Sequence, residues 1–329
     1  IRDRYWVENP HPWRHQCRDG MPPVDDADVI AREEAAKKAA ESDDAGSVSS
    51  GAHGARLRGF GVRVAWLLAF TFAHDCWDWE TWRVRRDIIW PATEARRRCR
   101  YAELDEVAPH TGPATVFMSH CWGASWGGLV MAACAGARED RIVWIDVFAV
   151  RARAPRERES REGGGGPTAS RDLRAFSLAL RAQVRQWPGN GADLDFRGVI
   201  QGCAALMVAA PIIEGEMTKE FMQFDDDRAA FLASEAGVAA KKSLFGFRLW
   251  CVVELHAALH FGKPVIIRAG KAAHEGDAVK FDTEGAVDML ENLSRMIDVE
   301  RAECAVRADY DREMDAAVSY PHLTLPTKA

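Results

Sequence analysis

The sequence predicts an α/β protein, with a doubly wound, flavodoxin-like parallel sheet and flanking helices, and two observations support this. The first is a set of four short apolar runs, at residues 115–119, 142–148, 204–210 and 265–268. Apolar runs without polar alternation are typical of strands buried on both faces, as they are in a parallel sheet. The second is that helix-like stretches separate the runs, at residues 126–137, around 196–203 and at 249–261. Such alternation of strand and helix is typical of α/β domains.

Composition limits the classes to which the chain can belong. Its 329 residues, 47% of them hydrophobic, can bury one substantial core with helical additions. A net charge of −6 gives no general attraction to nucleic acid or to an anionic membrane. The longest apolar run, residues 64–73, is about half of the roughly 20 residues that a membrane span needs. The eight cysteines lack CxxC spacing, which is typical of reduced thiols, so we expect a cytoplasmic protein. From the charge and the short apolar run, we expect no nucleic-acid or membrane partner.

The segments before the predicted sheet differ in character. Residues 1–56 carry prolines, a run of Ala, Lys, Glu and Asp, and a Ser/Gly-rich end, a composition that cannot bury a core. We therefore expect a mobile leader there. Residues 57–110 carry aromatic side chains at spacings that suit buried helix faces, which predicts a helical support for the sheet. These aromatic residues are Trp66, Phe70, Trp77, Trp82 and Trp90.

Three further segments complete the predicted division. Residues 151–184 are basic, glycine-rich and longer than an ordinary connection, so they are interpreted as an insertion within an α/β domain spanning residues 111–270. Residues 271–318 are predicted to be a C-terminal helical segment, because apolar residues recur there at helical spacing. The final residues, 319–329, resemble the read-through of a sequencing adaptor and are left out of the fold prediction. The apolar residues at helical spacing within residues 271–318 are Val287, Leu290, Leu293 and Ile297.

Glu254 is the most informative residue of the sequence, because it is a lone carboxylate in an otherwise apolar helix. A carboxylate in such surroundings needs a partner, a polar cleft or solvent. Trp250 lies four residues earlier, which places it on the same helix face. Gly262 and Pro264 end the helix just before the fourth apolar run. The helix therefore predicts a ligand site formed by an acid and an aromatic ring.

Polar residues also follow the other predicted strands. In a doubly wound sheet, ligands bind outside the carboxyl ends of the strands. The segment from Ser119 to Gly123 follows the first strand, Asp146 is predicted within the second, and Pro211 follows the third. Together with Glu254, these features are expected to meet at one edge of the sheet.

Three motifs and their order along the chain resemble those of the TIR superfamily. The resemblance is greatest to the TIR-like domains of heterokaryon-incompatibility proteins and of algal and protist proteins. Val116 to Gly123 is similar to a Ser-x-x-Trp-Gly loop, and Val143 to Asp146 contains a similar Trp-Ile-Asp. The strongest similarity is at Arg248 to Leu255, which contains Trp-Cys-x-x-Glu-Leu. The resemblance covers about half of the chain.

The resemblance implies an intracellular signalling or defence protein that cleaves NAD and associates with itself. Glu254 corresponds to the glutamate that cleaves NAD in plant-type TIR domains. Acting as an ionised group, it would stabilise the positive charge that develops on ribose as nicotinamide leaves. NAD is then the substrate, and no prosthetic group or metal is implied. The residues expected to shape the NAD pocket are Ser119, His120, Trp122, Asp146, Arg248 and Trp250.

The sequence also departs from the family pattern and leaves alternatives open. The Asn-Gln pair expected after Trp-Ile-Asp is missing unless Gln186, beyond the insertion, supplies the glutamine, and no fifth strand is evident after Gly270. One alternative is a non-catalytic interaction module, in which Glu254 pairs with a base such as Arg248. A weaker alternative is a nucleotide hydrolase of another α/β type. The absence of a glycine-rich phosphate loop after a predicted strand argues against this alternative.

Several other residues have simpler interpretations. Cys121 and Cys251 are expected to be packed thiols. His256 and His260 share a helix face but have no evident third ligand, so a solvated face is favoured over a metal site. Asp146 could bind ribose or could cap a loop.

Overall fold

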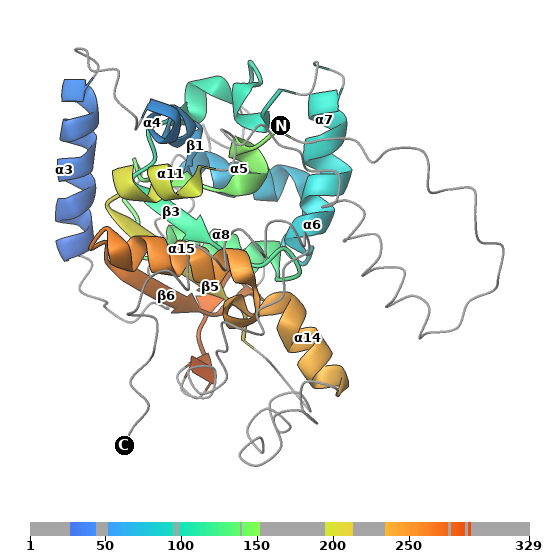
Figure 1. Ribbon diagram of the computed structural model, residues 1–329. Coiled ribbons are helices and arrows are strands. Elements are labelled where there is room, and N and C mark those ends of the chain that lie inside the picture. Colours follow the sequence, from blue (N-terminus) through green and yellow to red (C-terminus); the bar gives the residue numbers. More distant parts are fainter. Residues whose placement is uncertain are drawn as a thin grey trace, which may run out of the picture.

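The chain forms a six-stranded mixed sheet with helices on both faces (Figure 1). The computed structural model describes residues 27–43, 52–94, 96, 99–138, 140–151, 195–212, 234–275, 278–286 and 289–290. The strand order is β2-β1-β4-β3-β5-β6. The strands are β1 (Gly61–Arg63), β2 (Thr111–Gly112), β3 (Val116–Ser119), β4 (Ile142–Trp144), β5 (Ala205–Ala210) and β6 (Val265–Ala269).

The four strands that the apolar runs predicted are parallel to one another. β3 pairs with β4 on one side and with β5 on the other, and β5 pairs with β6. β1 is antiparallel to β4, and β2 is antiparallel to β1. The α/β prediction is therefore confirmed. The chain passes from β3 to β4 in one direction and then returns to β5 on the other side of β3, so the strand order reverses between β3 and β5.

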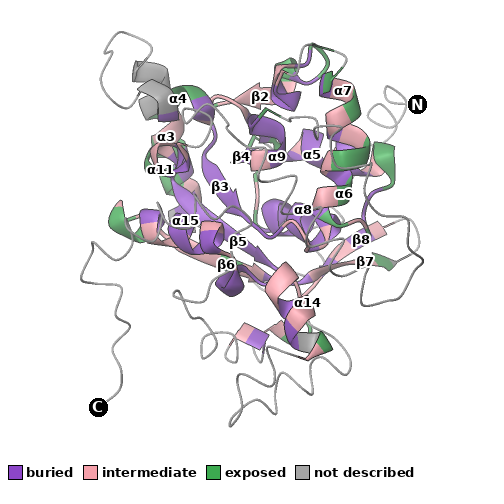
Figure 2. Ribbon diagram, turned by 45° about the vertical axis from the view of Figure 1, so that its right-hand side comes forward, coloured by how far each residue is buried: buried purple, intermediate pink, exposed green. Residues whose placement is uncertain are grey.

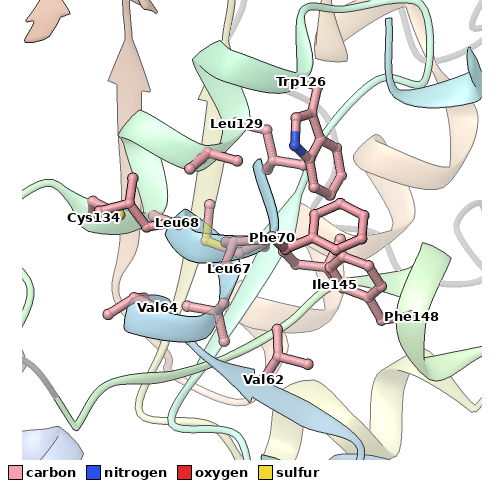
Figure 3. Close-up of a cluster of buried hydrophobic side chains, with 14 of the residues drawn as sticks. Val62, Val64, Leu67, Leu68, Phe70, Trp126, Leu129, Cys134, Ile145 and Phe148 are labelled. Carbon is pink, nitrogen blue, oxygen red and sulfur yellow. The ribbon is translucent and has the colours of Figure 1, made fainter. Parts of the chain in front are cut away.

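Alternate residues of each central strand enter two different hydrophobic cores. On one face, Val116 and Met118 of β3 pack with helices α5 (Val64–His74) and α8 (Trp126–Cys134). Figure 3 shows side chains of these two helices in this core, among them Leu67 and Trp126. On the other face, Phe117 packs with α11 (Phe196–Gly202) and α15 (Leu249–His260). Figure 2 shows β3 and β5 buried along their whole length. This burial on both faces explains why the strands read as uninterrupted apolar runs.

Local capping fixes the starts of two of these helices close to the predicted positions. The Ser125 hydroxyl accepts a hydrogen bond from the Gly128 N–H at 3.3 Å, which caps α8. The Asp195 carboxylate accepts one from the Gly198 N–H at 3.0 Å, which caps α11. Side-chain acceptors at these positions satisfy N–H groups that have no partner within the helix.

The second predicted strand is shorter than expected. The apolar run from 142 to 148 was predicted to be one strand containing Asp146, but β4 ends at Trp144 and helix α9 (Asp146–Ala149) follows. Asp146 therefore lies in the first turn of a helix, where the positive end of the helix dipole favours an acidic side chain. The apolar side chains that follow it pack into the core as helical residues rather than strand residues.

The structure also differs from the predicted domain division in three places. Within the expected leader, residues Ala27–Asp43 form helix α3. Within the expected helical support, Gly61–Arg63 is strand β1 of the main sheet. At the start of the expected C-terminal helical segment, β7 (Lys271–Glu275) and β8 (Ala278–Asp282) form an antiparallel hairpin. Apart from Arg151, the predicted insertion lies outside the described residues, as do most of the predicted C-terminal helix and the final tail.

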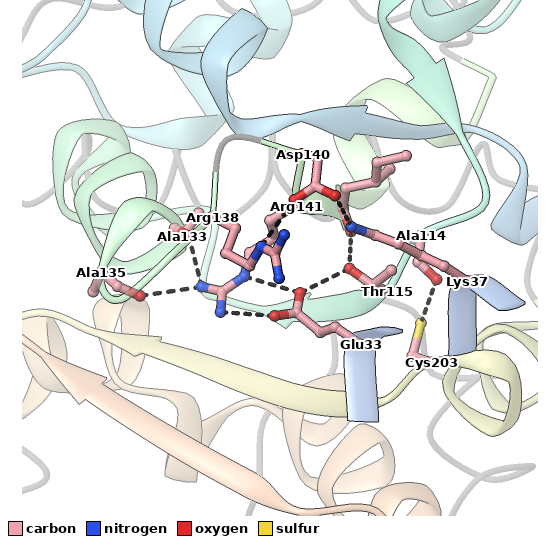
Figure 4. A network of polar contacts seen from close by, with 11 residues as sticks. Glu33, Lys37, Ala114, Thr115, Ala133, Ala135, Arg138, Asp140, Arg141 and Cys203 are labelled. Atoms are coloured by element: carbon pink, nitrogen blue, oxygen red, sulfur yellow. Dashed lines mark hydrogen bonds and ion pairs between the residues drawn. The ribbon is translucent and has the colours of Figure 1, made fainter. Parts of the chain in front are cut away.

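Helix α3 is tied to the amino ends of β3 and β4 by a buried polar network (Figure 4). Arg141, whose side chain is fully buried, donates from Nε and Nη2 to the two carboxylate oxygens of Glu33, both at 3.0 Å. Its Nη1 donates to the carbonyls of Ala133 and Ala135 at 3.3 and 3.1 Å. The Thr115 hydroxyl donates to Glu33 Oε1 at 2.8 Å. We call Glu33, Thr115 and Arg141 the amino-end network.

Candidate functional site

A small pocket lies where the strand order reverses. It is lined by residues that follow or end three parallel strands, including His120 and Cys121 after β3, Ala210 and Pro211 at the end of β5, and Gly270 after β6. Its volume of about 10 Å³ leaves room for roughly one water molecule. The carboxyl edge of the strands at the reversal is the usual ligand position in open α/β sheets.

His120 of this lining belongs to a group of four polar residues that we call the carboxyl-end cluster: Ser119, His120, Asp146 and Glu254. Each has one buried side-chain atom that makes no hydrogen bond to any described residue: Ser119 Oγ, His120 Nε2, Asp146 Oδ1 and Glu254 Oε2. Such an atom costs about 1–3 kcal/mol if nothing replaces its lost water. A concentration of them in one place therefore calls for an explanation other than stability.

Glu254 lies in the second turn of α15 and is only 7% exposed. Burial, followed by the proximity of Cys251, raises the pKa of Glu254 well above its usual value. Ser119 lies close enough to oppose this pKa shift, although its hydroxyl makes no regular hydrogen bond to a described residue. The structure thus differs from the expectation of an ionised carboxylate, because low solvent access favours the protonated form. Among the described residues, Glu254 also has no ion pair, so the predicted pairing with Arg248 is not formed.

His120 and Asp146 face each other across a gap. His120 Nε2 and Asp146 Oδ1 are 3.8 Å apart, which is too long for a hydrogen bond. Burial lowers the pKa of His120, although Asp146 opposes that shift, so the imidazole favours its neutral form. The backbone of Met118 also opposes the lowering of this pKa. A neutral imidazole has one nitrogen that donates and one that accepts, so Nε2 can take either role. Nε2 and Oδ1 therefore face a position that suits a group able both to donate and to accept.

Trp122 and Arg85 complete the surroundings of Asp146. The Trp122 indole donates from Nε1 to Asp146 Oδ2 at 2.8 Å. The Arg85 guanidinium carbon lies 5.0 Å from the centroid of the Trp122 ring, within cation–π range. Burial lowers the pKa of Arg85, and the charge of Asp146 opposes that effect. Arginine nevertheless remains protonated in proteins, so Arg85 supplies a permanent positive charge here.

Sequence reasoning missed Arg85. It lies on the π-helical turn Arg85–Ile89, within the segment that was interpreted as a helical support. No local signal separates it from Arg83 and Arg86, whose guanidinium groups stack on Trp79 and Trp82 at 4.0 and 4.4 Å. Only the fold brings one of these three arginines to the carboxyl edge.

The two remaining predicted site residues lie beside the cluster rather than in it. Trp250 packs on Phe196 of α11, with ring centroids 5.3 Å apart. A large indole gains more from this apolar contact than from a polar cluster, which explains why it turns away. Arg248 is the N-cap residue of α15, and its charge acts on Cys251 by opposing the rise in that thiol's pKa.

The loop after β3 is held close to helix α14 (Glu235–Ser243). A Cβ atom on Gly123 would lie 2.7 Å from the carbonyl oxygen of Lys242. Real Cβ contacts do not come this close, so glycine is required at this position. The glycine of the predicted Trp-Gly motif therefore has a packing role.

Metal and membrane features are not found in the part of the chain that the structure describes. His256 and His260 have ring centroids 6.4 Å apart, and no group of three His, Cys, Asp or Glu side chains there could hold a metal ion. Within the same residues, every helix is too short or too polar to cross a membrane.

Fold and site together define an α/β protein with a polar cluster at the carboxyl ends of its parallel strands. Comparison of the chain with protein-family models, with curated proteins and with solved structures finds no match.

Proposed function

We propose that this chain is a TIR-like signalling or defence protein that binds NAD at the carboxyl-end cluster and cleaves its nicotinamide–ribose bond. The strand order supports the fold assignment. Numbered along the chain, the four parallel strands lie in the order 2-1-3-4, which is the order of a flavodoxin-like sheet without its fifth strand. The motifs at Ser119 to Trp122, at Asp146 and at Glu254 come from three separate segments of the chain.

One observation carries the proposal: four buried polar atoms without partners, from these three segments, gather where the strand order reverses. Buried polar groups in a folded protein normally have partners. A polar ligand that supplies both donors and acceptors would satisfy all four atoms at once. His120 Nε2 and Asp146 Oδ1 suit a sugar hydroxyl, which can donate one hydrogen bond and accept another.

Glu254 would act as the catalytic residue after losing its proton. Its pKa is raised chiefly by burial. The oxidised nicotinamide ring is a cation, and a cation beside a buried acid favours the ionised form. Substrate binding would thus generate the carboxylate that stabilises the positive charge on ribose during bond cleavage. Nicotinamide leaves as a neutral molecule, so no second acid is required.

The pocket is smaller than a nucleotide, so the segments around the cluster must separate when NAD binds. If the open form is a minor population, the apparent affinity falls in proportion to that population. We therefore expect weak binding of NAD and slow turnover at low substrate concentration.

The test is release of nicotinamide from NAD by the purified chain and by its Glu254→Gln and Glu254→Ala variants. Loss of the carboxylate is expected to reduce the rate by about 10²-fold or more, the size of effect seen when one stabilising group is removed from an active site. Glu94→Gln is the matched control, because Glu94 is an exposed glutamate on helix α7 (Trp90–Glu94). Assays over a range of protein concentration would detect activity that needs self-association. Activity that survives both Glu254 substitutions would overturn the mechanism.

A second candidate, a self-associating interaction module, is favoured by a different observation. Leu259 of α15 and Ile267 of β6 are 66% and 40% exposed, and they are the large hydrophobic side chains that stand out at the surface of the described residues. β6 is also an edge strand of the sheet. Edge strands present unpaired backbone groups that favour pairing with another chain. Sedimentation of the native chain and of Leu259→Lys would test this, because the substitution should weaken a dimer without affecting the cluster.

A further inference from the structure

Two cysteine side chains meet beside the carboxyl-end cluster. Cys121 follows β3 and Cys251 lies in the first turn of α15, yet their sulfur atoms are only 3.9 Å apart. Cys251 Sγ also donates to the backbone carbonyl of His120 at 3.5 Å. Cys76 and Cys203 likewise donate to backbone carbonyls, those of Thr71 and Ala114, but Cys121 and Cys251 add a contact between two sulfur atoms. Cys121 and Cys251 are therefore placed as a thiol pair, which simple packing of small apolar residues does not require.

The two sulfur atoms are in contact but are not bonded to each other. A disulfide bond is about 2.05 Å long, so the two sulfur atoms would have to approach by roughly 2 Å. Side-chain rotation and a small shift of the first turn of α15 towards β3 would provide this movement. The segments joined are 130 residues apart in the chain, so the encounter depends on the folded structure.

The two cysteines differ in their position relative to the pocket. Cys121 is one of the residues that line it and Cys251 is not, and both residues are almost fully buried, at 1% and 3% exposure. The pocket has room for roughly one water molecule. A small, uncharged oxidant close to the size of water, such as hydrogen peroxide, would thus reach Cys121 first.

We propose that Cys121 and Cys251 form a peroxide-sensitive modification site, in which Cys121 is oxidised first and Cys251 resolves it to a disulfide. In the first step the Cys121 thiol takes one oxygen atom from hydrogen peroxide, which yields a sulfenic acid and water. In the second step Cys251 Sγ attacks the Cys121 sulfur, and the hydroxyl leaves with the Cys251 proton as a second water. Peroxide is reduced, and two thiols are oxidised to one disulfide.

The order of events agrees with the surroundings of Cys251. Its hydrogen bond with Cys121, followed by burial, raises the pKa of the Cys251 thiol. A thiol that keeps its proton is a poor first nucleophile for peroxide. Once Cys121 carries a hydroxyl leaving group, the same proton is available to convert that group to water.

The bridge would also alter the candidate site. Cys251 lies one helical turn before Glu254, and its proximity contributes to the raised pKa of that carboxyl group. Drawing the first turn of α15 towards β3 would move Glu254 relative to Ser119. This inference does not rest on NAD cleavage, since the thiol pair exists whatever the cluster binds.

The test is peptide mapping by mass spectrometry after treatment of the folded chain with hydrogen peroxide and blocking of the remaining thiols under denaturing conditions. The expected result is a linked pair of peptides containing Cys121 and Cys251, lighter by two hydrogens than the two reduced peptides together. The linked pair should be the dominant disulfide in the folded chain and in the control Cys203→Ser. When the chain is unfolded before oxidation, it should fall to one of many pairings.

Recovery of Cys121 and Cys251 as separate blocked thiols would overturn the proposal. So would recovery of Cys121 from the native chain mainly as the sulfinic acid, because that would mean that Cys251 does not reach it. Cys251→Ser gives a second check: it should convert the disulfide product into over-oxidised Cys121. Because the main comparison uses the native chain, it does not depend on whether a variant folds.

Discussion

Buried polar residues lie at both ends of strands β3 and β4, but the two groups differ in whether their polar atoms have hydrogen-bond partners. At the amino ends, the hydrogen-bonding groups of Glu33, Thr115 and Arg141 pair with one another or with backbone carbonyls. At the carboxyl ends, Ser119, His120, Asp146 and Glu254 each retain a buried atom without a partner in the described part of the chain. The first arrangement holds the fold together, whereas the second is suited to a ligand.

The contrast follows from the stability of buried polar groups. A satisfied charged network contributes structural specificity, and breaking it leaves a charge without compensation. An unsatisfied cluster destabilises the fold, and it persists where function requires it. Substitutions at the two ends should therefore have effects of different size and even of different sign.

The largest effect is expected for Glu33→Ala. This change leaves the Arg141 guanidinium, which is fully buried, without its carboxylate partner. Removing one partner of a buried ion pair costs about 3–5 kcal/mol, and we expect a loss of this size in the free energy of unfolding measured with denaturant. The neighbouring Glu34→Ala is the control, because Glu34 pairs with Arg138 at the surface. Exposed ion pairs contribute about 1 kcal/mol or less, so equal losses for the two variants would contradict the description of the amino end.

Smaller losses of unfolding free energy are expected for substitutions at the two ends of β3. Thr115→Val removes the hydroxyl that donates to Glu33 and should cost about 1–3 kcal/mol of unfolding free energy. Ser119→Ala removes a hydroxyl that makes no regular hydrogen bond, so its cost should be below about 0.5 kcal/mol. Chemical denaturation of both variants measures the difference. A cost for Ser119→Ala as large as that for Thr115→Val would mean that Ser119 belongs to a satisfied network.

An effect of the opposite sign is expected at Glu254. The folded-state pKa of Glu254 is raised above its usual value of 4.5, so the folded chain keeps a proton that the unfolded chain releases. The contribution of this group to stability therefore falls as the pH rises above that value. Glu254→Gln has no such proton and should be more stable than the native chain at neutral pH, by on the order of 1 kcal/mol.

The pH dependence supplies the check on this prediction. The gain in stability of Glu254→Gln should shrink as the pH is lowered through 4.5 and vanish below it, where both the folded and the unfolded native chain hold the proton. Glu94→Gln, at an exposed site, should show no comparable trend. If Glu254→Gln were less stable than the native chain at neutral pH, the carboxyl group would have a partner that stabilises it.

The strands and the edge at which the cluster forms could be predicted from sequence, because both depend on simple patterns. β3, β5 and β6 are apolar runs, and the rule that ligands bind at the carboxyl ends of parallel strands located Ser119, Asp146 and Glu254 at one edge. β1 could not be predicted, because its three residues, Gly61–Arg63, are too few to form a pattern. The polar composition of Ala27–Asp43 likewise gave no sign that Glu33 is buried, since this depends on its pairing with Arg141.

The chemistry of the site was harder to predict than its position. The expected charge of Glu254 was derived from its role in a resemblance, whereas its actual tendency to keep a proton follows from burial, which only the packing of α15 determines. Arg85 was missed for a related reason, since one of several neighbouring arginines is selected by tertiary structure alone. The spacing of Trp250 and Glu254 in the sequence predicts one shared helix face, but the Trp250 ring packs on Phe196.

The most direct test of the central claim is the midpoint of thermal unfolding measured with and without NAD. A ligand that binds only the folded state raises this midpoint, whether or not it is cleaved. We expect NAD to raise the midpoint of the native chain and of Glu94→Gln, and to have a smaller effect on Asp146→Ala, which lacks the acceptor opposite His120. No rise for the native chain, or an undiminished rise for Asp146→Ala, would contradict the assignment of the carboxyl-end cluster as an NAD site.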